Sequence, residues 1–271
     1  MTTSMIIALI LLPAIGLVAG IGLGIAAHFM AVKENEKAKA IREVLPGANC
    51  GACGFSGCSG YAEALATSPN IKVTLCTVGG NAVAQEIGSI LGVTAEKMTP
   101  MCAVVRCAGS VDASEKKAEY SGIQSCRAAA MLYNGGNACR FGCIGLGDCA
   151  AVCDQNAVSI RRGVAVIDAE KCKACGKCVT ACPKQVIAVI PKGSVPYVAC
   201  RNSDKAPETK KVCSAGCLGC RMCSKVCEAD AIAFEGGRAV IDSAKCIGCG
   251  KCAEACKFGV IKKTGLVKID T

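Results

Sequence analysis

The chain has 271 residues and 25 cysteines, with 3% aromatic residues and no tryptophan, so its small domains cannot bury enough apolar area to be stable without a second stabilising element. The cysteines are the candidates for that element, and their odd number argues against a closed disulfide framework. The formal net charge of +10 is common in nucleic-acid-binding proteins, but no basic run is interleaved with stacking aromatic side chains, which argues against nucleic acid as a partner.

The first predicted element is a transmembrane helix. His28 is the only polar side chain between Met5 and Val32, and about 28 residues of this kind can cross a bilayer core of ~30 Å as a tilted helix. A signal peptide is the alternative, but no Lys or Arg precedes the segment, which is also too long for an h-region. Basic residues begin at Lys33, so the positive-inside rule places the N-terminus outside and the rest of the chain in the cytoplasm. Residues 1–32 are therefore predicted to be a single-pass anchor in the cell membrane.

Glycines recur every four residues along this predicted helix, at Gly16, Gly20 and Gly24. They form a smooth stripe on which the backbone of a partner's membrane helix could pack closely. The alternative is that glycine is simply common in membrane helices. The sequence leaves both interpretations open.

A charged, helix-prone segment from Lys33 to Leu45 follows and ends at Pro46-Gly47, which breaks helices. We interpret it as a stalk. Beyond it, three cysteines lie within nine residues on a glycine-rich loop, and a fourth precedes a Gly79-Gly80 turn. A glycine-rich backbone can wrap closely round a compact inorganic core, whereas zinc favours paired CxxC motifs. We therefore predict a [4Fe–4S] site made by Cys50, Cys53, Cys58 and Cys76.

The bacterial ferredoxin spacing C-x2-C-x2-C-x3-C occurs three times, starting at Cys172, Cys217 and Cys246, and Pro183 follows the first run. Such runs come in pairs, because the fourth cysteine of each run ligates the cluster of the other. One predicted cluster is held by Cys217, Cys220, Cys223 and Cys256. Its neighbour is held by Cys227, Cys246, Cys249 and Cys252.

The C-terminal half contains an internal repeat, in which two copies align at one fixed spacing. The aligned pairs include Cys143 with Cys217, Cys149 with Cys223, Cys153 with Cys227, and the run from Cys172 with the run from Cys246. The β-prone segments from Ala165 to Asp168 and from Ala239 to Asp242 also align, and they predict short strands. The repeat is typical of a duplicated dicluster ferredoxin module.

The first copy lacks one ligand, because Leu146 takes the place of Cys220. Cys139 lies four residues before Cys143 and can reach that site from the other side. One cluster of the first copy is therefore predicted to use Cys139, Cys143, Cys149 and Cys182. The other is predicted to use Cys153, Cys172, Cys175 and Cys178.

Five [4Fe–4S] clusters are thus expected, and five cysteines are left over: Cys102, Cys107, Cys126, Cys200 and Cys213. We expect these to be buried near the clusters as small hydrophobic side chains. A sixth cluster using Cys102, Cys107 and Cys126 is the alternative, although no compact run of ligands supports it. Each oxidised cluster with four thiolates carries a charge of about −2, so five would contribute roughly −10 and offset the basic residues.

The fold class predicted from these elements is α+β. It comprises an N-terminal single transmembrane helix, a small Cys-rich 4Fe–4S domain and two tandem bacterial-type dicluster ferredoxin modules. The predicted boundaries are 1–32 for the anchor, 33–100 for the stalk and N-terminal 4Fe–4S domain, 101–135 for a connecting segment, 136–193 for the first module and 194–271 for the second.

The anchor, the stalk, the block from Cys50 to Leu65 and the paired ferredoxin runs together resemble the B subunit of the Rnf complex, the ion-translocating ferredoxin:NAD oxidoreductase of bacterial membranes. With two ferredoxin pairs, the chain is similar to the longer form of this family. The resemblance implies that reduced soluble ferredoxin delivers electrons to the cluster domains, which relay them through the N-terminal cluster to membrane subunits. Other subunits would hold the flavins and the NAD site, and the complex would couple electron flow to Na⁺ or H⁺ transport.

The chain is then expected to be the electron-relay subunit of a translocase, with no substrate-converting site of its own. The absence of dinucleotide and phosphate-binding loops, and of an acid–base constellation around the single His28, agrees with this role. One alternative is an iron–sulfur wiring subunit of another membrane redox complex, such as a hydrogenase or a reductase. A structural zinc protein is a third interpretation, which the ferredoxin spacing disfavours.

Overall fold

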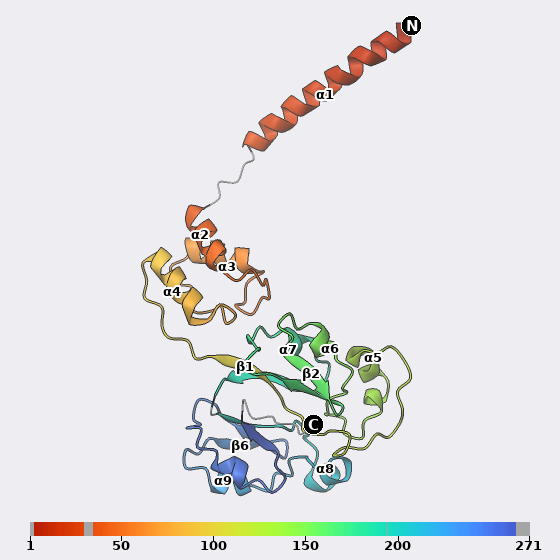
Figure 1. Ribbon diagram of the computed structural model, residues 1–271, viewed down its shortest axis with the longest axis vertical. Coiled ribbons are helices and arrows are strands. Elements are labelled where there is room, and N and C mark those ends of the chain that lie inside the picture. Colours follow the sequence, from red (N-terminus) through yellow and green to blue (C-terminus); the bar gives the residue numbers. More distant parts are fainter. Residues whose placement is uncertain (1–2, 30–34, 194, 264–271) are drawn as a thin grey trace.

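The computed structural model of the protein describes residues 3–29, 35–193 and 195–263 (Figure 1). Parts of three predicted segments lie outside these residues. They are residues 1–2 and 30–32 of the anchor, 33–34 of the stalk, and 194 and 264–271 of the second module.

The first element, α1, is a helix of 27 residues, Thr3–Phe29, that stands apart from the other elements in Figure 1. The large apolar side chains of Leu17, Val18 and Leu23 are exposed on it. An added Cβ would meet nothing within 4 Å at the glycines of the predicted stripe, Gly16, Gly20 and Gly24. Among the described residues, no helix combines the length and apolar character needed to cross a bilayer. The predicted transmembrane helix is therefore not confirmed.

Three helices form the N-terminal domain: α2 (Glu36–Val44), α3 (Cys58–Thr67) and α4 (Gly80–Leu91). The side chain of Asn35 caps α2 by accepting a hydrogen bond from the backbone N–H of Lys37 at 3.0 Å. Ile41 of α2, Tyr61 of α3 and Ile87 of α4 are buried together in one core. α2 therefore belongs to this core, where the sequence predicts a stalk.

Each ferredoxin module contains an antiparallel hairpin and two short helices, and the two sets occupy equivalent positions of the repeat. In the first module these are β2 (Val158–Arg161), β3 (Val164–Ile167), α6 (Asp148–Ala151) and α7 (Lys177–Ala181). In the second they are β6 (Ile232–Glu235), β7 (Arg238–Ile241), α9 (Met222–Lys225) and α10 (Lys251–Glu254). The pairing register is also the same, since Val158 faces Ile167 and Ile232 faces Ile241. The same elements therefore recur at equivalent positions of the repeat, and β3 and β7 each begin and end one residue before the predicted segment.

A second two-stranded sheet in each module joins strands that are distant in sequence. β1 (Met101–Val105) pairs with β4 (Ile187–Pro191), and β5 (Pro196–Val198) pairs with β8 (Ile261–Lys263). Ala103 faces Val189 and Pro196 faces Lys263, so Ala103 and Pro196 occupy equivalent places in the two modules. β1 thus lies in the sheet of the first module, within a segment that the sequence predicts to be a connection.

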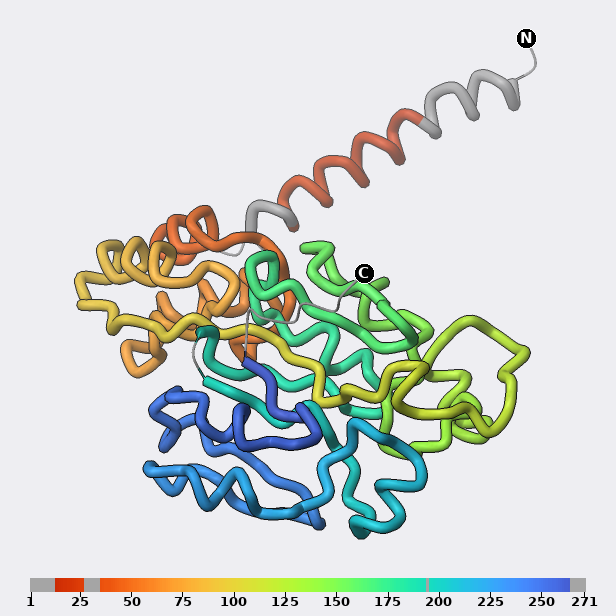
Figure 2. Tube along the Cα trace, turned by 60° about the horizontal axis from the view of Figure 1, so that its bottom comes forward, coloured from red at the N-terminus to blue at the C-terminus, as the bar shows by residue number. Residues whose placement is uncertain are grey.

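The two modules lie side by side, the first in green and the second in blue in Figure 2. The segments that follow β1 and β5 make the contact; they carry α5 (Cys126–Met131), η1 (Tyr133–Gly136) and α8 (Ala206–Val212). The hydroxyl of Ser114 donates to the carbonyl of Val212 at 2.9 Å, and the N–H of Ser214 donates to the carbonyl of Ala113 at 2.8 Å. These bonds fix the segments of the two modules against each other.

Candidate iron–sulfur centres

The predicted N-terminal ligands line one cavity of about 330 Å³; they are Cys50, Cys53, Cys58 and Cys76. The loop that carries the first three bends at Gly57, whose φ of 115° is disfavoured for other residues. A Cβ on Gly57 would lie 2.8 Å from Oδ1 of Asn49, and this oxygen accepts a hydrogen bond from the N–H of Cys58 at 2.8 Å. Gly57 therefore allows Asn49 to fix the third cysteine at the start of α3.

Burial affects the protonation of one of these thiols, Cys76. It raises the pKa of Cys76, and the N–H of Gly79 opposes this by donating to Sγ of Cys76 at 3.4 Å. The neighbouring thiols that also raise this pKa are Cys58, Cys50 and Cys53. A raised pKa favours the neutral thiol of Cys76, and a bound cation would supply the charge that favours its thiolate. Three cysteines on a glycine-rich loop and a fourth, Cys76, that lines the same cavity fit the ligand set of a [4Fe–4S] cluster.

Both predicted sets of the second module are brought together. A cavity of about 350 Å³ is lined by Cys217, Cys220, Cys223 and Cys256. A cavity of about 330 Å³ is lined by Cys227, Cys246, Cys249 and Cys252. Ala239 donates its N–H to Sγ of Cys217, and Ala231 donates its N–H to Sγ of Cys227, each at 3.4 Å. Each of the three cavities is lined by four cysteines, the number of thiolates that a [4Fe–4S] cluster takes.

The predicted set that includes Cys172 is also assembled in the first module. Burial raises the pKa of Cys178 to about 11, and the neighbouring thiols that add to the shift are Cys172, Cys175 and Cys153. Sγ of Cys153 accepts a hydrogen bond from the N–H of Ala157 at 3.3 Å. This bond is the counterpart of the Ala231 bond in the second module.

For the other predicted set of the first module, the structure brings a further cysteine, Cys126, close to Cys143 and Cys149. Burial raises the pKa values of Cys143 and Cys149 to about 11, and Cys126 is a neighbouring thiol that adds to the shift at both. Cys149 also has Cys182 as a neighbour. Cys126 therefore lies where the sequence predicts Cys139.

Asp148 holds Cys126 in this place. Its carboxylate accepts hydrogen bonds from the N–H groups of Cys126 at 2.9 Å and Arg127 at 3.0 Å, at the start of α5. It also accepts a hydrogen bond from the hydroxyl of Ser125 at 2.9 Å. Because Asp148 directly precedes Cys149, these bonds tie α5 to α6. Sequence reasoning missed this contact, because it joins residues that are far apart along the chain.

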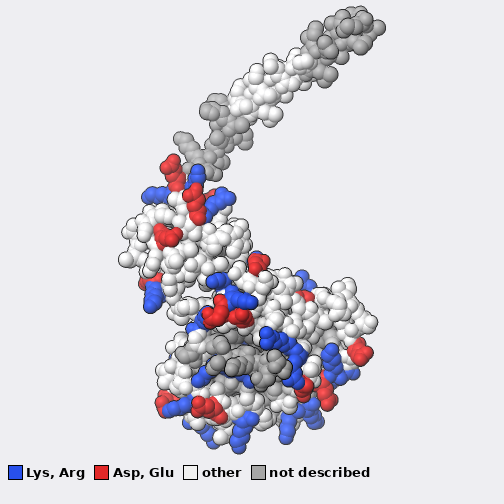
Figure 3. Space-filling view, in the orientation of Figure 1, with Lys and Arg blue, Asp and Glu red and all other residues white. Residues whose placement is uncertain are grey.

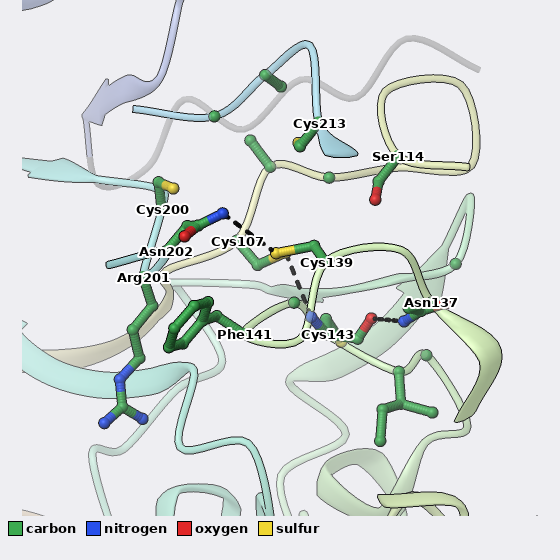
Figure 4. A pocket seen from close by; sticks show the side chains of 18 of the residues that line it. Cys107, Ser114, Asn137, Cys139, Phe141, Cys143, Cys200, Arg201, Asn202 and Cys213 are labelled. Carbon is green, nitrogen blue, oxygen red and sulfur yellow. Dashed lines mark hydrogen bonds between the residues drawn. The ribbon is translucent and has the colours of Figure 1, made fainter. Parts of the chain in front are cut away.

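Cys139 lies instead in a larger cavity of about 810 Å³, which residues of both modules line. Figure 4 shows this cavity, which we name the intermodule cavity. The cysteines that line it are Cys107, Cys139, Cys143, Cys200 and Cys213. Three of these, Cys107, Cys200 and Cys213, belong to none of the five clusters predicted from the sequence.

The sixth cluster considered from the sequence is not assembled. Cys102 is fully buried in β1, and burial raises its pKa to about 11, with the neighbouring Cys172 thiol adding to the shift. It packs against Tyr197 in an apolar cluster, as expected for a small hydrophobic side chain. Cys107 lies in the intermodule cavity, and Cys126 lies beside α6, so the three cysteines occupy three different places.

Charged side chains of both signs are spread over the face shown in Figure 3, and the described side chains of α1 carry no charge.

One ion pair recurs in both modules, between Lys177 and Asp154 and between Lys251 and Glu228. These hydrogen bonds raise the pKa values of both lysines, which remain cationic beside the thiols. Within the described chain, no group of three or more Cys, His, Asp or Glu side chains is placed to hold a single metal ion.

Three family models match parts of the chain. A model described as a putative Fe-S cluster matches residues 45–78, and a 4Fe-4S binding domain matches residues 164–187. A 4Fe-4S dicluster domain matches residues 216–260. The matched ranges contain the cysteines of the N-terminal cavity, the run from Cys172 and both sets of the second module.

Curated proteins match over most of the chain. The B subunit of the Na⁺-translocating ferredoxin:NAD⁺ oxidoreductase complex of Acetobacterium woodii is 37% identical over 228 residues, which are 84% of this chain and 68% of the relative. The B subunit of the proton-translocating complex of Clostridium ljungdahlii is 38% identical over 240 residues, 88% of this chain and 84% of the relative. The B subunit of the ion-translocating oxidoreductase complex of Methanosarcina acetivorans is 36% identical over 243 residues, 89% of this chain and 92% of the relative. The chain belongs to this family of B subunits.

As a B subunit with three matched iron–sulfur segments, the chain is an iron–sulfur electron-relay subunit of a membrane-associated complex of several subunits. Cysteines in such a subunit bind electron carriers, which explains why this chain contains so many of them.

Proposed function

We propose that this B subunit relays electrons from reduced ferredoxin to the membrane and flavin subunits of a complex that couples ferredoxin:NAD oxidoreduction to Na⁺ or H⁺ transport. The names of the Acetobacterium and Clostridium relatives support the overall reaction and differ in the ion. The part assigned to this chain is to hold the electron carriers close together and to shield them from water.

The proposal gives the chain five [4Fe–4S] clusters. Four ligand sets are those predicted from the sequence, and we name them the N-terminal site, the Cys172 site, the Cys217 site and the Cys246 site. The fifth, the Cys143 site, takes Cys126 in place of Cys139; its ligands are Cys126, Cys143, Cys149 and Cys182. When bound, each cluster carries one electron at a time, at a potential that hydrogen bonds to its sulfurs help to set.

The observation that carries the relay is the contact between the N-terminal site and the first ferredoxin module. Thr77 directly follows a ligand of the N-terminal site, and its hydroxyl donates to the carbonyl of Ala174 in the ligand loop of the Cys172 site at 3.5 Å. Lys177 lies within electrostatic reach of both Cys175 and Cys50. These contacts place the two sites next to each other, and the proposal has electrons pass from the modules to the N-terminal site.

Electrons are proposed to enter at the second module. Cys220 and Cys249, one ligand of each of its clusters, are exposed in the structure. An exposed ligand lets a soluble donor approach the cluster without opening the module. The route then runs from the second module through the first to the N-terminal site, next to α1.

We also propose that α1 anchors the chain in the cell membrane with its N-terminus outside and the cluster domains on the cytoplasmic side. The apolar sequence of residues 1–32 and the basic residues from Lys33 onwards support this orientation. The glycine stripe of Gly16, Gly20 and Gly24 would then face a partner subunit. Substituting Gly20 with Leu should release the chain from its complex, and an intact complex would contradict the packing role.

The proposed boundaries of the two ferredoxin modules follow the pairing of their strands. Residues 33–100 form the N-terminal domain, residues 101–193 form the first ferredoxin module including β1, and residues 194–271 form the second. The pairing of β1 with β4 supports moving the connecting segment into the first module.

Reduction by ferredoxin tests the function directly. The chain, purified without oxygen, is mixed with reduced ferredoxin while the cluster absorbance near roughly 400 nm is followed. We expect the absorbance to bleach to the level that chemical reduction gives. Bleaching by the chemical reductant but not by ferredoxin would rule out ferredoxin as the donor.

A further inference from the structure

Four cysteines of the intermodule cavity have no role in the five clusters above: Cys107, Cys139, Cys200 and Cys213. Figure 4 shows them around the same space, contributed by segments of both modules. A Cβ on Gly109 would lie 3.4 Å from Sγ of Cys213 and 3.6 Å from Sγ of Cys107. Both distances are measured from the same Cβ position, so the two sulfurs border the same small space beside Gly109. Cys139 and Cys200 are also neighbours of Cys213.

The four cysteines form two equivalent pairs, one from each module. Cys107 lies two residues after β1, and Cys200 lies two residues after the equivalent strand β5. The residue before each makes the same backbone bond, from Arg106 to Val186 in one module and from Ala199 to Val260 in the other, at 2.6 and 2.7 Å. Cys139 and Cys213 occupy matching positions of the sequence repeat. Each module thus contributes the same two positions to the cavity.

The sulfurs also receive the hydrogen bonds that cluster ligands require. The N–H of Cys143 donates to Sγ of Cys107 at 3.3 Å, and the N–H of Cys217, the repeat counterpart of Cys143, bonds to the thiol of Cys200. The side-chain amide of Asn202, which is 2% exposed, donates to Sγ of Cys139 at 3.8 Å. Such donors stabilise thiolates bound to iron.

Positive charge lines the same cavity, which Arg106 and Arg201 both border. Nε of Arg106 is buried and has no hydrogen-bond partner within the described residues. A cluster with a charge of about −2 in the cavity would offset this positive charge.

We propose that the intermodule cavity holds a sixth [4Fe–4S] cluster, with the ligands Cys107, Cys139, Cys200 and Cys213. Each module supplies two thiolates, so the site forms only when both modules are folded and docked. The ligand set stands on the geometry alone, whereas the role of the cluster rests on the function proposed above.

In that role the sixth cluster connects the two modules. Cys143 is a ligand of the Cys143 site and Cys217 is a ligand of the Cys217 site, and each touches one sulfur of the intermodule cavity. A single electron would pass from the Cys217 site to the sixth cluster and then from the sixth cluster to the Cys143 site. No proton or other group is transferred in these steps.

Iron and acid-labile sulfide content of the full chain, purified without oxygen, tests the ligand set. Six clusters give about 24 of each per chain and five give about 20. The variants Cys107→Ala and Cys213→Ala remove one ligand from each module and should each lose about four iron atoms. The double variant should lose no more than either single variant, because all three lack the same cluster. The matched control is Cys102→Ala, which removes a buried cysteine and should keep all the iron.

A wild-type content of about 20, or full iron in both single variants, would overturn the proposal. If a variant loses more than one cluster because a module unfolds, the wild-type content decides: about 24 supports six clusters and about 20 excludes the sixth. The ferredoxin reduction assay is read separately. If the chain contains six clusters but ferredoxin cannot reduce it, the sixth site is supported and ferredoxin is ruled out as the donor.

Discussion

The backbone N–H of Ala103 in β1 donates a hydrogen bond to Sγ of Cys172 at 3.3 Å. The equivalent residue of the second module is Pro196, which lines the cavity of the Cys246 site and has no N–H to donate. Both sites keep a further N–H···S hydrogen bond of 3.4 Å within the ligand loop. Two of the proposed cluster sites, in equivalent places of the repeat, therefore differ by one hydrogen bond.

This difference predicts that the Cys172 cluster has the higher reduction potential, because N–H···S bonds stabilise the more negative, reduced state. A net hydrogen bond of about 1 kcal/mol corresponds to on the order of 40 mV for one electron. Ala103→Pro should lower the potential of the Cys172 cluster by about this amount, and Pro196→Ala should raise that of the Cys246 cluster. Redox titration followed by EPR measures both. Equal potentials in wild type, unmoved by either substitution, would contradict the argument.

The carboxylate of Asp148 predicts a local effect on the Cys143 site. Asp148→Ala removes three hydrogen bonds to a charged acceptor at the start of α5, at a cost of about 2 kcal/mol in local stability. We expect faster loss of about four iron atoms per chain in the presence of a chelator, with the other clusters retained. Asp112→Ala is the control, because Asp112 forms an exposed ion pair with Arg162 away from this contact. Equal iron loss in the two variants would remove the role given to Asp148.

The same contact has a predictable pH dependence. Burial raises the pKa of Asp148, but the hydrogen bonds from Cys126, Arg127 and Ser125 lower it below the ordinary value of 3.8. A carboxyl with a lowered pKa in the folded state stabilises the fold above its unfolded value and loses that effect as the pH falls through the lowered one. As the pH falls below 3.8, the rate of iron release from the Cys143 site should therefore rise more steeply in wild type than in Asp148→Ala.

Four of the five proposed ligand sets follow from the sequence, because their spacing is local and the repeat suggests the partner of each fourth cysteine. The Cys143 site could not be completed in this way. Leu146 replaces Cys220 there, and Cys139 is nearer in sequence to the gap than Cys126. Only the fold shows that Asp148 brings Cys126 to the site, where the second module has Met222 at the matching position.

The intermodule cavity was beyond sequence reasoning for a related reason. Cys139 and Cys213 match at the spacing of the repeat, but Cys107 and Cys200 are farther apart, since the first module has a longer connection between β1 and its ligand run. Self-comparison at one spacing therefore pairs Cys200 with Cys126. The strand pairings match Cys107 with Cys200 instead, because β1 pairs with β4 as β5 pairs with β8, and each cysteine follows its strand by two residues.

The hydroxyl of Tyr61 predicts how firmly the fourth ligand of the N-terminal site is held. It donates to the carbonyl of Lys72 at 2.7 Å and accepts from the N–H of Leu75 at 3.4 Å, directly before Cys76. Tyr61→Phe leaves both backbone groups without this partner and should destabilise the site by about 1 to 2 kcal/mol. Iron release by a chelator measures this, with Tyr120→Phe, which alters a tyrosine outside the N-terminal domain, as the control.

Burial also raises the pKa of Tyr61 to about 12 from 10.0, with the Leu75 bond opposing the shift. For a group whose pKa is raised on folding, the stabilising effect is complete below the unfolded value and disappears as the pH rises through the folded one. Between pH 10 and 12, iron release should accelerate in wild type more than in Tyr61→Phe. Identical alkaline profiles would show that this hydroxyl does not secure the site.

Cluster binding should also hold each ferredoxin module together. Cys143, Cys149 and Cys178, which are proposed ligands of two different clusters, lie in one core with Val164 and Val186. Apolar packing in the first module should therefore depend on both clusters. Cys175→Ala should therefore cost the first module both of its clusters, about eight iron atoms, and its resistance to protease.

The repeat provides the matched control for this prediction. Cys249 is the counterpart of Cys175, and Cys249→Ala should unfold the second module, whose core is separate, while leaving the first protected. Protease digestion followed by mass spectrometry identifies which module survives in each variant. If Cys175→Ala lost only about four iron atoms and the first module stayed resistant, the apolar core and the remaining cluster would be sufficient for its stability, and iron would serve this module as a redox cofactor alone.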